Sequence, residues 1–130
     1  GKIDDFLSRR RTLAHRYASA FKDNPFVMPA QNIDLDRSAN HLFPVAIDFD
    51  LLGKTRLDLV HALRAEGIIT QVHYIPVVMN PFYVSLGHNI KNFPNSYDYY
   101  SKALSLPLYF GLDDDDFDHV IKVIDRAFRK

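Results

Sequence analysis

The opening segment of the chain carries apolar residues at helical spacing, and this pattern places a strong demand on the rest of the fold. The apolar positions are Ile3, Phe6, Leu7, Leu13, Ala14, Tyr17, Ala18 and Phe21. They predict a helix from about Ile3 to Lys22, which ends before Pro25 because proline excludes the helical conformation from its predecessor. A single amphipathic helix must bury its stripe against other elements, so the remaining residues have to supply a partner. Arg9–Arg11 is expected to form a solvated basic face of this helix.

The next segments alternate between strand and helix signals. Within "HLFPVAIDFD" (residues 41–50), every second residue from Phe43 to Phe49 is apolar, which predicts a strand. Pro44 cannot donate to a ladder, so the pattern predicts an edge strand or a local break. Thr55 is the expected N-cap of a helix, with Asp58 as its capping-box partner and Gly67 as its left-handed C-terminal cap.

Four further elements are predicted beyond Gly67. "IITQVHY" (residues 68–74) is read as a strand, with Ile69, Gln71 and His73 on one face and Tyr74 on the other. The chain is then irregular until a short helix begins at Pro94, which leads into a short strand over "ALSLPLY". The last helix starts after an N-cap at Asp113, with a hydrophobic staple between Leu112 and Phe117.

This order of elements predicts the fold class. A chain of 130 residues fits one domain, and 47% apolar residues suffice to bury a core. Helices and strands in this succession predict a small α+β domain, with helices on one face of a sheet of three or more strands.

Composition excludes several kinds of site. The chain has no cysteine, which rules out disulfides and cysteine-based metal sites or nucleophiles. Equal numbers of basic and acidic residues, 16 of each, give no footprint for nucleic acid or an anionic membrane. Asp113–Asp116 is expected to cap a helix rather than bind a metal, because consecutive helical side chains fan out. The six histidines show no paired ligand spacing, so no metal site is predicted.

The stretch "QVHYIPVVMNPFY" (residues 71–83) is the main candidate site. A predicted strand ends there in a proline-bounded segment that holds one histidine and three aromatic rings. His73 can be a hydrogen-bonded structural residue, or a functional group presented at a strand end. The neighbouring aromatic residues can form a stacking surface or pack in a core. Spacing alone leaves both alternatives open.

Several segments of the chain resemble a known family in their actual residues, and not only in the spacing of apolar positions. "GIITQVHYIPVVMNPFY" and "FPNSYDYYSKALSLPLYFGLDDDDFDHVIKVID" resemble the C-terminal part of the DegT/DnrJ/StrS sugar aminotransferases, which are fold-type-I enzymes that use pyridoxal 5'-phosphate. "RRRTLAHRYASAF" and "HLFPVAIDFD" match the same family in the same order. The resemblance implies an interdomain helix over residues 1–24 and an aminotransferase small domain over residues 25–130.

The resemblance also implies an activity for a longer parent protein. The parent would move an amino group from glutamate to the C4 keto group of a UDP-linked deoxy sugar, as in pseudaminic acid type biosynthesis. Pyridoxal 5'-phosphate would be bound by a large domain that this chain lacks, and the protein would be a cytoplasmic homodimer. No lysine here stands in a family motif like the one around the cofactor lysine. The fragment alone is therefore expected to be inactive, with no catalytic or cofactor-binding residue of its own.

The resemblance assigns the substrate-contact residues one by one. His73 and Tyr74 match the family's "VHY" segment, which faces the cofactor and the sugar, and Asn80 is the third expected contact. The chain departs from the family at Val78, where the usual pattern has a second histidine. That departure indicates a changed sugar preference or simple drift.

Two other functions compete with this interpretation. The chain can be a free-standing, non-catalytic binding or dimerisation module of the same fold, which would pair through the exposed stripe of its first helix. An oligosaccharide- or nucleic-acid-binding domain is supported only by the aromatic residues, and without a basic groove it ranks last.

Overall fold

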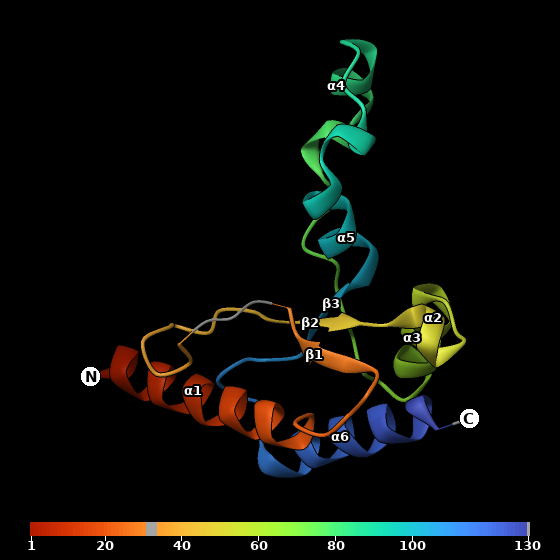
Figure 1. Cartoon of the computed structure of the whole chain (residues 1–130). Helices are drawn as coiled ribbons and strands as arrows, with labels where there is room; N and C mark the ends of the chain where they lie inside the picture. Colours follow the sequence, from red (N-terminus) through yellow and green to blue (C-terminus); the bar gives the residue numbers. More distant parts are fainter. Residues whose placement is uncertain (31–33, 130) are drawn as a thin grey trace.

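The molecule consists of a layered body and a long arm that projects from it (Figure 1). The computed structural model describes residues 1–30 and 34–129. The helices are α1 (Lys2–Ala20), α2 (Phe49–Leu52), α3 (Arg56–Ala65), α4 (Pro81–Ser85), α5 (Pro94–Lys102) and α6 (Asp114–Phe128). The strands are β1 (Val27–Pro29), β2 (Phe43–Ile47) and β3 (Ala103–Leu106), and short 3-10 turns span Val77–Met79 and Ile90–Asn92. We call residues 74–102 the arm, and the other described residues the body.

The body confirms the predicted α+β class. An antiparallel sheet with the order β1-β2-β3 lies above α1 and α6, which run side by side beneath it (Figure 1). Strand β1 was not predicted, because three residues are too few to show an alternating pattern. Phe49 does not continue β2 as expected, since it begins the short helix α2.

Pro44 lies in the central strand of the sheet, so the expectation of an edge strand is wrong. It pairs with Ser105 of β3 on one side, and its carbonyl accepts from the Ala30 N–H at 3.1 Å on the other. In an antiparallel pair the N–H and C=O of one residue face the same neighbour. The N–H that Pro44 lacks would have faced Ala30, one residue past the end of β1. The proline is tolerated because the one bond that it cannot donate lies at the end of the pairing with β1, which is the local break expected as the alternative.

Residues 68–74 do not form the predicted strand. Gln71 makes an isolated antiparallel bridge to Ser105, and the rest of the segment is extended without a ladder. The preceding helix α3 ends as predicted, with Gly67 at φ +80°. The Gly67 N–H donates to the Arg64 carbonyl at 3.0 Å, and the Ile68 N–H donates to the Leu63 carbonyl at 2.9 Å. This is a Schellman motif, and it commits Ile68 to the helix end rather than to a strand.

The apolar stripe of α1 is buried in its second half, as a partnered helix requires. Tyr17 is fully buried, with its ring centroid 4.8 Å from Phe43 and 4.5 Å from Phe117. Its hydroxyl donates to the Pro107 carbonyl at 2.8 Å, and burial raises the pKa of the phenol far above its usual range. Among the apolar residues of the stripe, Ile3 and Phe6 in the first half of the helix are exposed. Most of the stripe is therefore buried in the body's own core, and little of its apolar surface is exposed for contact with a second copy.

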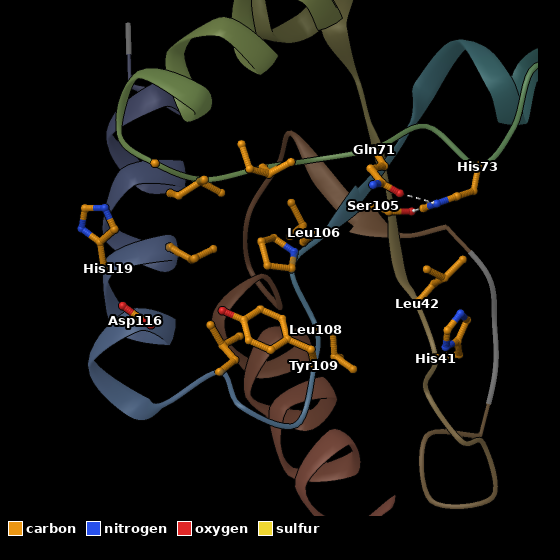
Figure 2. A pocket seen from close by; sticks show the side chains of 16 residues that line it. His41, Leu42, Gln71, His73, Ser105, Leu106, Leu108, Tyr109, Asp116 and His119 are labelled. Atoms are coloured by element: carbon orange, nitrogen blue, oxygen red, sulfur yellow. Dashed lines mark hydrogen bonds between the residues drawn. The ribbon is translucent and has the colours of Figure 1, made fainter. Parts of the chain in front are cut away.

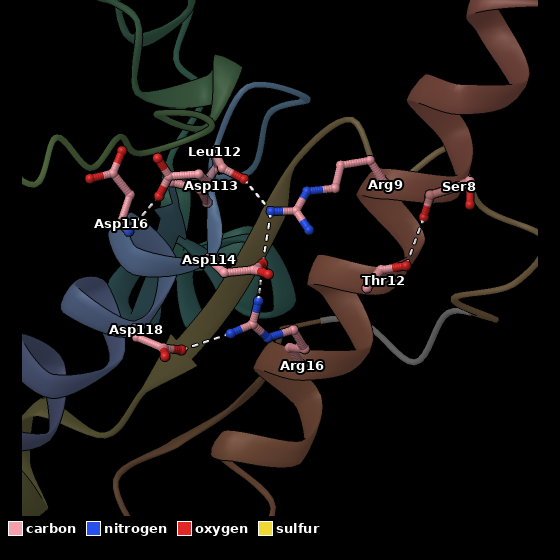
Figure 3. Close-up of polar contacts among 9 residues, drawn as sticks. All are labelled: Ser8, Arg9, Thr12, Arg16, Leu112, Asp113, Asp114, Asp116 and Asp118. Atoms are coloured by element: carbon pink, nitrogen blue, oxygen red, sulfur yellow. Dashed lines mark hydrogen bonds and ion pairs between the residues drawn. The ribbon is translucent and has the colours of Figure 1, made fainter.

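Ion pairs fasten α1 to the start of α6 (Figure 3). Arg16 contacts Asp114 at 2.6 Å and Asp118 at 2.7 Å, and Arg9 contacts Asp114 at 3.0 Å. The Arg9 guanidinium, with Arg16 beside it, holds the pKa of the Asp114 carboxyl below its usual range. The Arg9 side chain also donates to the Leu112 carbonyl.

The prediction that Arg9–Arg11 forms a solvated face is wrong. All three residues are partly buried, and Arg11 Nε donates to the Ser38 carbonyl at 3.2 Å. Arg9 bonds the turn before α6 and Arg11 bonds the loop before β2, so these two side chains hold connections onto the helix. A helical period cannot reveal this, because the partners lie far away in the sequence.

The start of α6 confirms its predicted signals. The Asp113 carboxylate accepts from the Asp116 N–H at 2.8 Å, which makes it the N-cap. Leu112 and Phe117, the expected staple, are both buried in the core. In residues 1–30 and 34–129, no group of three or more His, Asp or Glu side chains is placed to hold a metal ion. None of the helices in these residues combines the length and hydropathy needed to cross a membrane.

Candidate functional site

His73 lies at the base of the arm, where two residues of the body converge on its ring (Figure 2). The Gln71 N–H donates to the Ser105 carbonyl at 3.2 Å, and the Ser105 N–H donates to the Gln71 carbonyl at 2.7 Å. This pair of backbone hydrogen bonds places both side chains beside His73. Its Nδ1 is 2.8 Å from Ser105 Oγ, and its Nε2 is 2.8 Å from Gln71 Oε1. Both ring nitrogens are therefore engaged within the chain.

Tyr74 packs against the His73 ring rather than pointing to the opposite face. The ring centroids are 4.7 Å apart with an interplanar angle of 82°, which is an edge-to-face contact. The expected alternation fails because the ladder stops at Gln71. Tyr74 is 74% exposed. Its phenol is therefore the group at this point that an approaching molecule can reach.

A cavity of about 420 Å³ opens beside the His73 cluster in the body (Figure 2). Gln71, His73 and Ser105 form one polar wall, while His41 and His119 stand at the rim. His119 Nε2 donates to the Glu66 carbonyl at 3.0 Å. The remaining wall is mostly aliphatic, from Ile68, Ile69, Leu106, Leu108, Leu112 and Val120. Such a mixture of an apolar wall and a few fixed polar groups suits a small organic ligand.

A second hollow lies along the arm and includes Tyr74. This open groove of about 550 Å³ is lined by Tyr74, Ile75, Pro76, Val77, Val78, Phe93, Asn95, Ser96 and Tyr99. Val78, where the family pattern has a histidine, contributes only an aliphatic side chain to it. His73 thus faces the cavity in the body, whereas Tyr74 faces the groove on the arm.

Asn80 is not brought together with His73 and Tyr74. It is the N-cap of α4, and its side-chain oxygen accepts from the Phe82 N–H at 3.1 Å. Helix α4 forms the outer part of the arm, well away from the sheet where His73 lies (Figure 1). The three predicted contacts therefore occupy two places, a pair at the base of the arm and one residue near its tip.

The surface of the arm differs in kind from that of the body. The chain has 16 basic and 16 acidic residues, but the arm holds only Lys91, Asp98 and Lys102. It carries five of the seven tyrosines. Its exposed apolar residues are Tyr74, Ile75, Val77, Phe82, Tyr83, Val84, Leu86, Phe93 and Tyr97. A charge-poor, aromatic, exposed surface of this extent is typical of a contact surface for another protein region.

Gln71 and Ser105 were not predicted as site residues. The alternation over residues 68–74 did place Gln71 on the same side as His73, which was a usable signal. Ser105 stands alone among the leucines of "ALSLPL" and is buried, yet a lone serine in a strand carries no specific signal. The contact between them joins positions far apart in the sequence, so only the fold reveals it.

Comparisons with known proteins match nearly the whole chain. The DegT/DnrJ/EryC1/StrS aminotransferase family matches residues 1–125. The spore coat polysaccharide biosynthesis protein SpsC of Bacillus subtilis is 39% identical over 125 residues, which are 95% of this chain and 32% of that protein. The UDP-4-amino-4,6-dideoxy-N-acetyl-beta-L-altrosamine transaminase of Helicobacter pylori is 28% identical over 127 residues, 98% of this chain and 33% of that protein.

The fold has the same relatives. The PLP-form of Spr1654 from Streptococcus pneumoniae, a sugar aminotransferase candidate, superposes with a TM-score of 0.81 at 26% identity. The superposition covers 95% of this chain and 31% of that one. The chain thus spans about a third of the length of the curated relatives it matches.

Proposed function

We infer, because the chain belongs to the DegT/DnrJ/EryC1/StrS aminotransferase family, that it serves a longer enzyme which aminates a nucleotide-linked sugar. The chain would be the small domain of such an enzyme, and its coverage of about a third of the relatives supports this. The amino group would pass from glutamate to the C4 keto group of a UDP-linked deoxy sugar. The observation that supports this most is the family match over residues 1–125. A UDP-amino-sugar transaminase is also among the relatives. A homodimer and a cytoplasmic location remain predictions.

The family is dependent on pyridoxal 5'-phosphate, but the residues described here do not fit the group. The cofactor supplies the electron sink for amino transfer and needs a lysine for its Schiff base. Neither the cavity beside His73 nor the groove on the arm has a lysine in its lining. Lys54 donates to the Ala127 carbonyl, and Lys102 pairs with Asp98. We therefore assign no step of the cofactor chemistry to this chain and expect it to be inactive alone.

The chain's own contribution would be one wall of the active-site cleft. Tyr74, which is exposed and backed by the His73 ring, would contact the sugar nucleotide directly. His73 would act from behind it, since both of its ring nitrogens already have partners. Asn80 would contribute an amide near the tip of the arm.

The arm would be the surface that meets the rest of the enzyme. Its exposed apolar residues and its three charged residues fit a permanent contact better than a solvated surface. Relatives three times as long hold the same fold, so they contain protein that can cover such a surface. The arm would then bring Tyr74 to a cofactor that is bound elsewhere.

The test is a comparison of the 130-residue chain with the full-length protein that contains it. The full-length protein should show the absorbance of a bound pyridoxal Schiff base and convert a UDP-linked 4-keto sugar with glutamate. The 130-residue chain should do neither. Tyr74→Ala in the full-length protein should impair use of the sugar and leave the cofactor absorbance intact. A full-length protein without a Schiff-base lysine, or wild-type kinetics in Tyr74→Ala, would contradict the proposal.

A further inference from the structure

We propose that Gln71 and Ser105 are positioning residues that fix the His73 ring, and through it the Tyr74 ring, at the base of the arm. Nothing in the family match assigns a role to either residue. The part of this proposal that concerns substrate rests on the proposed function, whereas the part that concerns the ring does not. Its basis is the convergence of two side chains from different segments on the two nitrogens of one imidazole.

The chemistry of the partners determines where the ring protons lie. The side-chain oxygen Oε1 of Gln71 can only accept a hydrogen bond. Nε2 of His73 therefore carries a hydrogen and donates it to this oxygen. In the neutral ring, Nδ1 then has no hydrogen and accepts from the Ser105 hydroxyl. If the ring takes a second proton at Nδ1, the hydroxyl turns and becomes the acceptor. The serine and the glutamine therefore hold the ring in one orientation in both charge states.

The backbones of both partners are held by hydrogen bonds, and Ser105 is also buried. Ser105 is 5% exposed and lies within β3, paired to Pro44 of the central strand. Gln71 is bonded to Ser105 through both backbone groups. A turn of the His73 ring would break two side-chain hydrogen bonds, and the buried Ser105 has no freedom to follow it. The orientation of the ring is therefore set by the sheet rather than by the exposed arm.

Tyr74 receives this orientation from His73. The edge-to-face contact at 4.7 Å fixes one side of an otherwise exposed ring. The Tyr99 hydroxyl donates to the His73 carbonyl at 3.5 Å, which ties the same backbone to α5. A phenol presented from a fixed ring loses less freedom when it binds a ligand than one on a free loop. The cluster would thus prepare Tyr74 for contact with the nucleotide sugar.

The first experiment measures the tautomer of the His73 ring in the 130-residue chain. Long-range ¹H–¹⁵N NMR should show His73 as a single tautomer, with the hydrogen on Nε2 and Nδ1 as an acceptor. Gln71→Leu should remove the acceptor of the Nε2 hydrogen and give a mixture of tautomers. Ser105→Ala should shift the Nδ1 signal because Nδ1 loses its donor, whereas Ser105→Thr should keep the hydroxyl and the wild-type signals. Ser101→Ala is the matched control, because its hydroxyl donates to the Asp98 carbonyl, away from His73.

The second experiment measures the kinetics of the full-length enzyme. Ser105→Ala and Gln71→Leu should raise KM for the sugar nucleotide roughly tenfold, because a displaced contact group costs binding and alignment, with cofactor absorbance unchanged. Ser105→Thr should recover most of this loss.

The outcomes separate the two claims. Mixed tautomers in the wild type, or an unchanged His73 spectrum in Ser105→Ala, would overturn the positioning of the ring. An unchanged KM in both variants would overturn its role in binding the sugar. An inactive wild-type enzyme would instead contradict the proposed function, and the NMR result would still decide the role of Gln71 and Ser105.

Discussion

The body and the arm of this molecule form helices by the same local rules but differ in what surrounds those helices. In the body, Thr55 accepts from the Asp58 N–H and the Asp58 carboxylate accepts from the Thr55 N–H, which caps α3. In the arm, Asn80 caps α4 in a similar way, with Pro81 at the first helical position. The difference appears only in burial, because α3 places Leu59 and Leu63 in the core and α4 buries no residue.

The charges show the same contrast. The body pairs Arg9 and Arg16 with Asp114, and these contacts join elements about a hundred residues apart. The ion pair of the arm, Lys102 with Asp98, lies within one helix. Outside the base of α5, where the Tyr100 carbonyl accepts from Arg56 and Tyr99 donates to the His73 carbonyl, the arm has mainly local contacts. A region with few non-local contacts and exposed apolar groups gains little stability by itself. The body carries its own core, whereas the arm leaves its large apolar side chains exposed, as expected if another protein region covers them.

The largest expected effect comes from the centre of the body's core. Tyr17→Ala should lower the free energy of unfolding by about 3–5 kcal/mol, the range for truncation of a buried aromatic side chain. Tyr97→Ala on the arm, where the ring is 53% exposed, should change it by less than about 0.5 kcal/mol. Urea unfolding of both variants, followed by circular dichroism, measures the difference. Equal losses would mean that the arm belongs to the same cooperative core.

A smaller effect is expected from the helix caps. Thr55→Ala removes the capping box of α3 and should cost about 1 kcal/mol of unfolding free energy. Asn80→Ala removes an equivalent cap but should leave the global unfolding midpoint unchanged, because α4 contributes nothing to the core. The same unfolding measurement compares the two variants. A larger loss in Asn80→Ala than in Thr55→Ala would reverse the assignment of stability to the body.

The smallest effect should be seen in the acid dependence of stability. Hydrogen bonds from Thr55 lower the pKa of Asp58, and Arg9 lowers that of Asp114. A carboxyl whose pKa is lower in the folded state stabilises the fold above its unfolded pKa, which is about 3.9 for aspartate. That stabilisation is lost as the pH falls through the lowered folded value. The thermal midpoint should therefore drop from pH 6 to pH 3, and less steeply in Asp114→Asn.

The control for the pH prediction is on the arm. Asp98→Asn removes its one carboxylate, whose pairing with Lys102 is exposed and within one helix. The acid dependence of the wild type should persist in that variant. A flattened curve in Asp98→Asn, together with an unchanged curve in Asp114→Asn, would contradict the placement of the acid-sensitive contacts in the body.

Sequence predicted the elements whose signals are local. The capping box at Thr55, the Gly67 cap and the Asp113 cap were expected and are confirmed. The strand expected over residues 103–109 is also present, but it ends at Leu106. Residues 68–74 were mistaken for a strand because alternation was visible but the ladder partner was not. The helical segments of the arm between Pro76 and Phe93 were expected to be irregular, since their turns are too short to show a period.

The site was predicted only in part for the same reason. Resemblance singled out His73 and Tyr74, which the structure places in contact with each other. The partners that hold His73 were missed, because Ser105 lies 32 positions away and reaches it only through the fold. Asn80 was grouped with the pair by resemblance, but it caps α4 in the outer part of the arm, away from them.

Hydrogen–deuterium exchange tests the contrast between body and arm most directly. Exchange would be measured on the 130-residue chain and on the full-length protein that contains it, under the same conditions. We predict that amides of residues 74–102 exchange quickly in the chain alone and become protected in the full-length protein, while α1, α6 and the sheet change little. Equal exchange of the arm in both proteins would show that nothing covers it and would contradict its role as a contact surface.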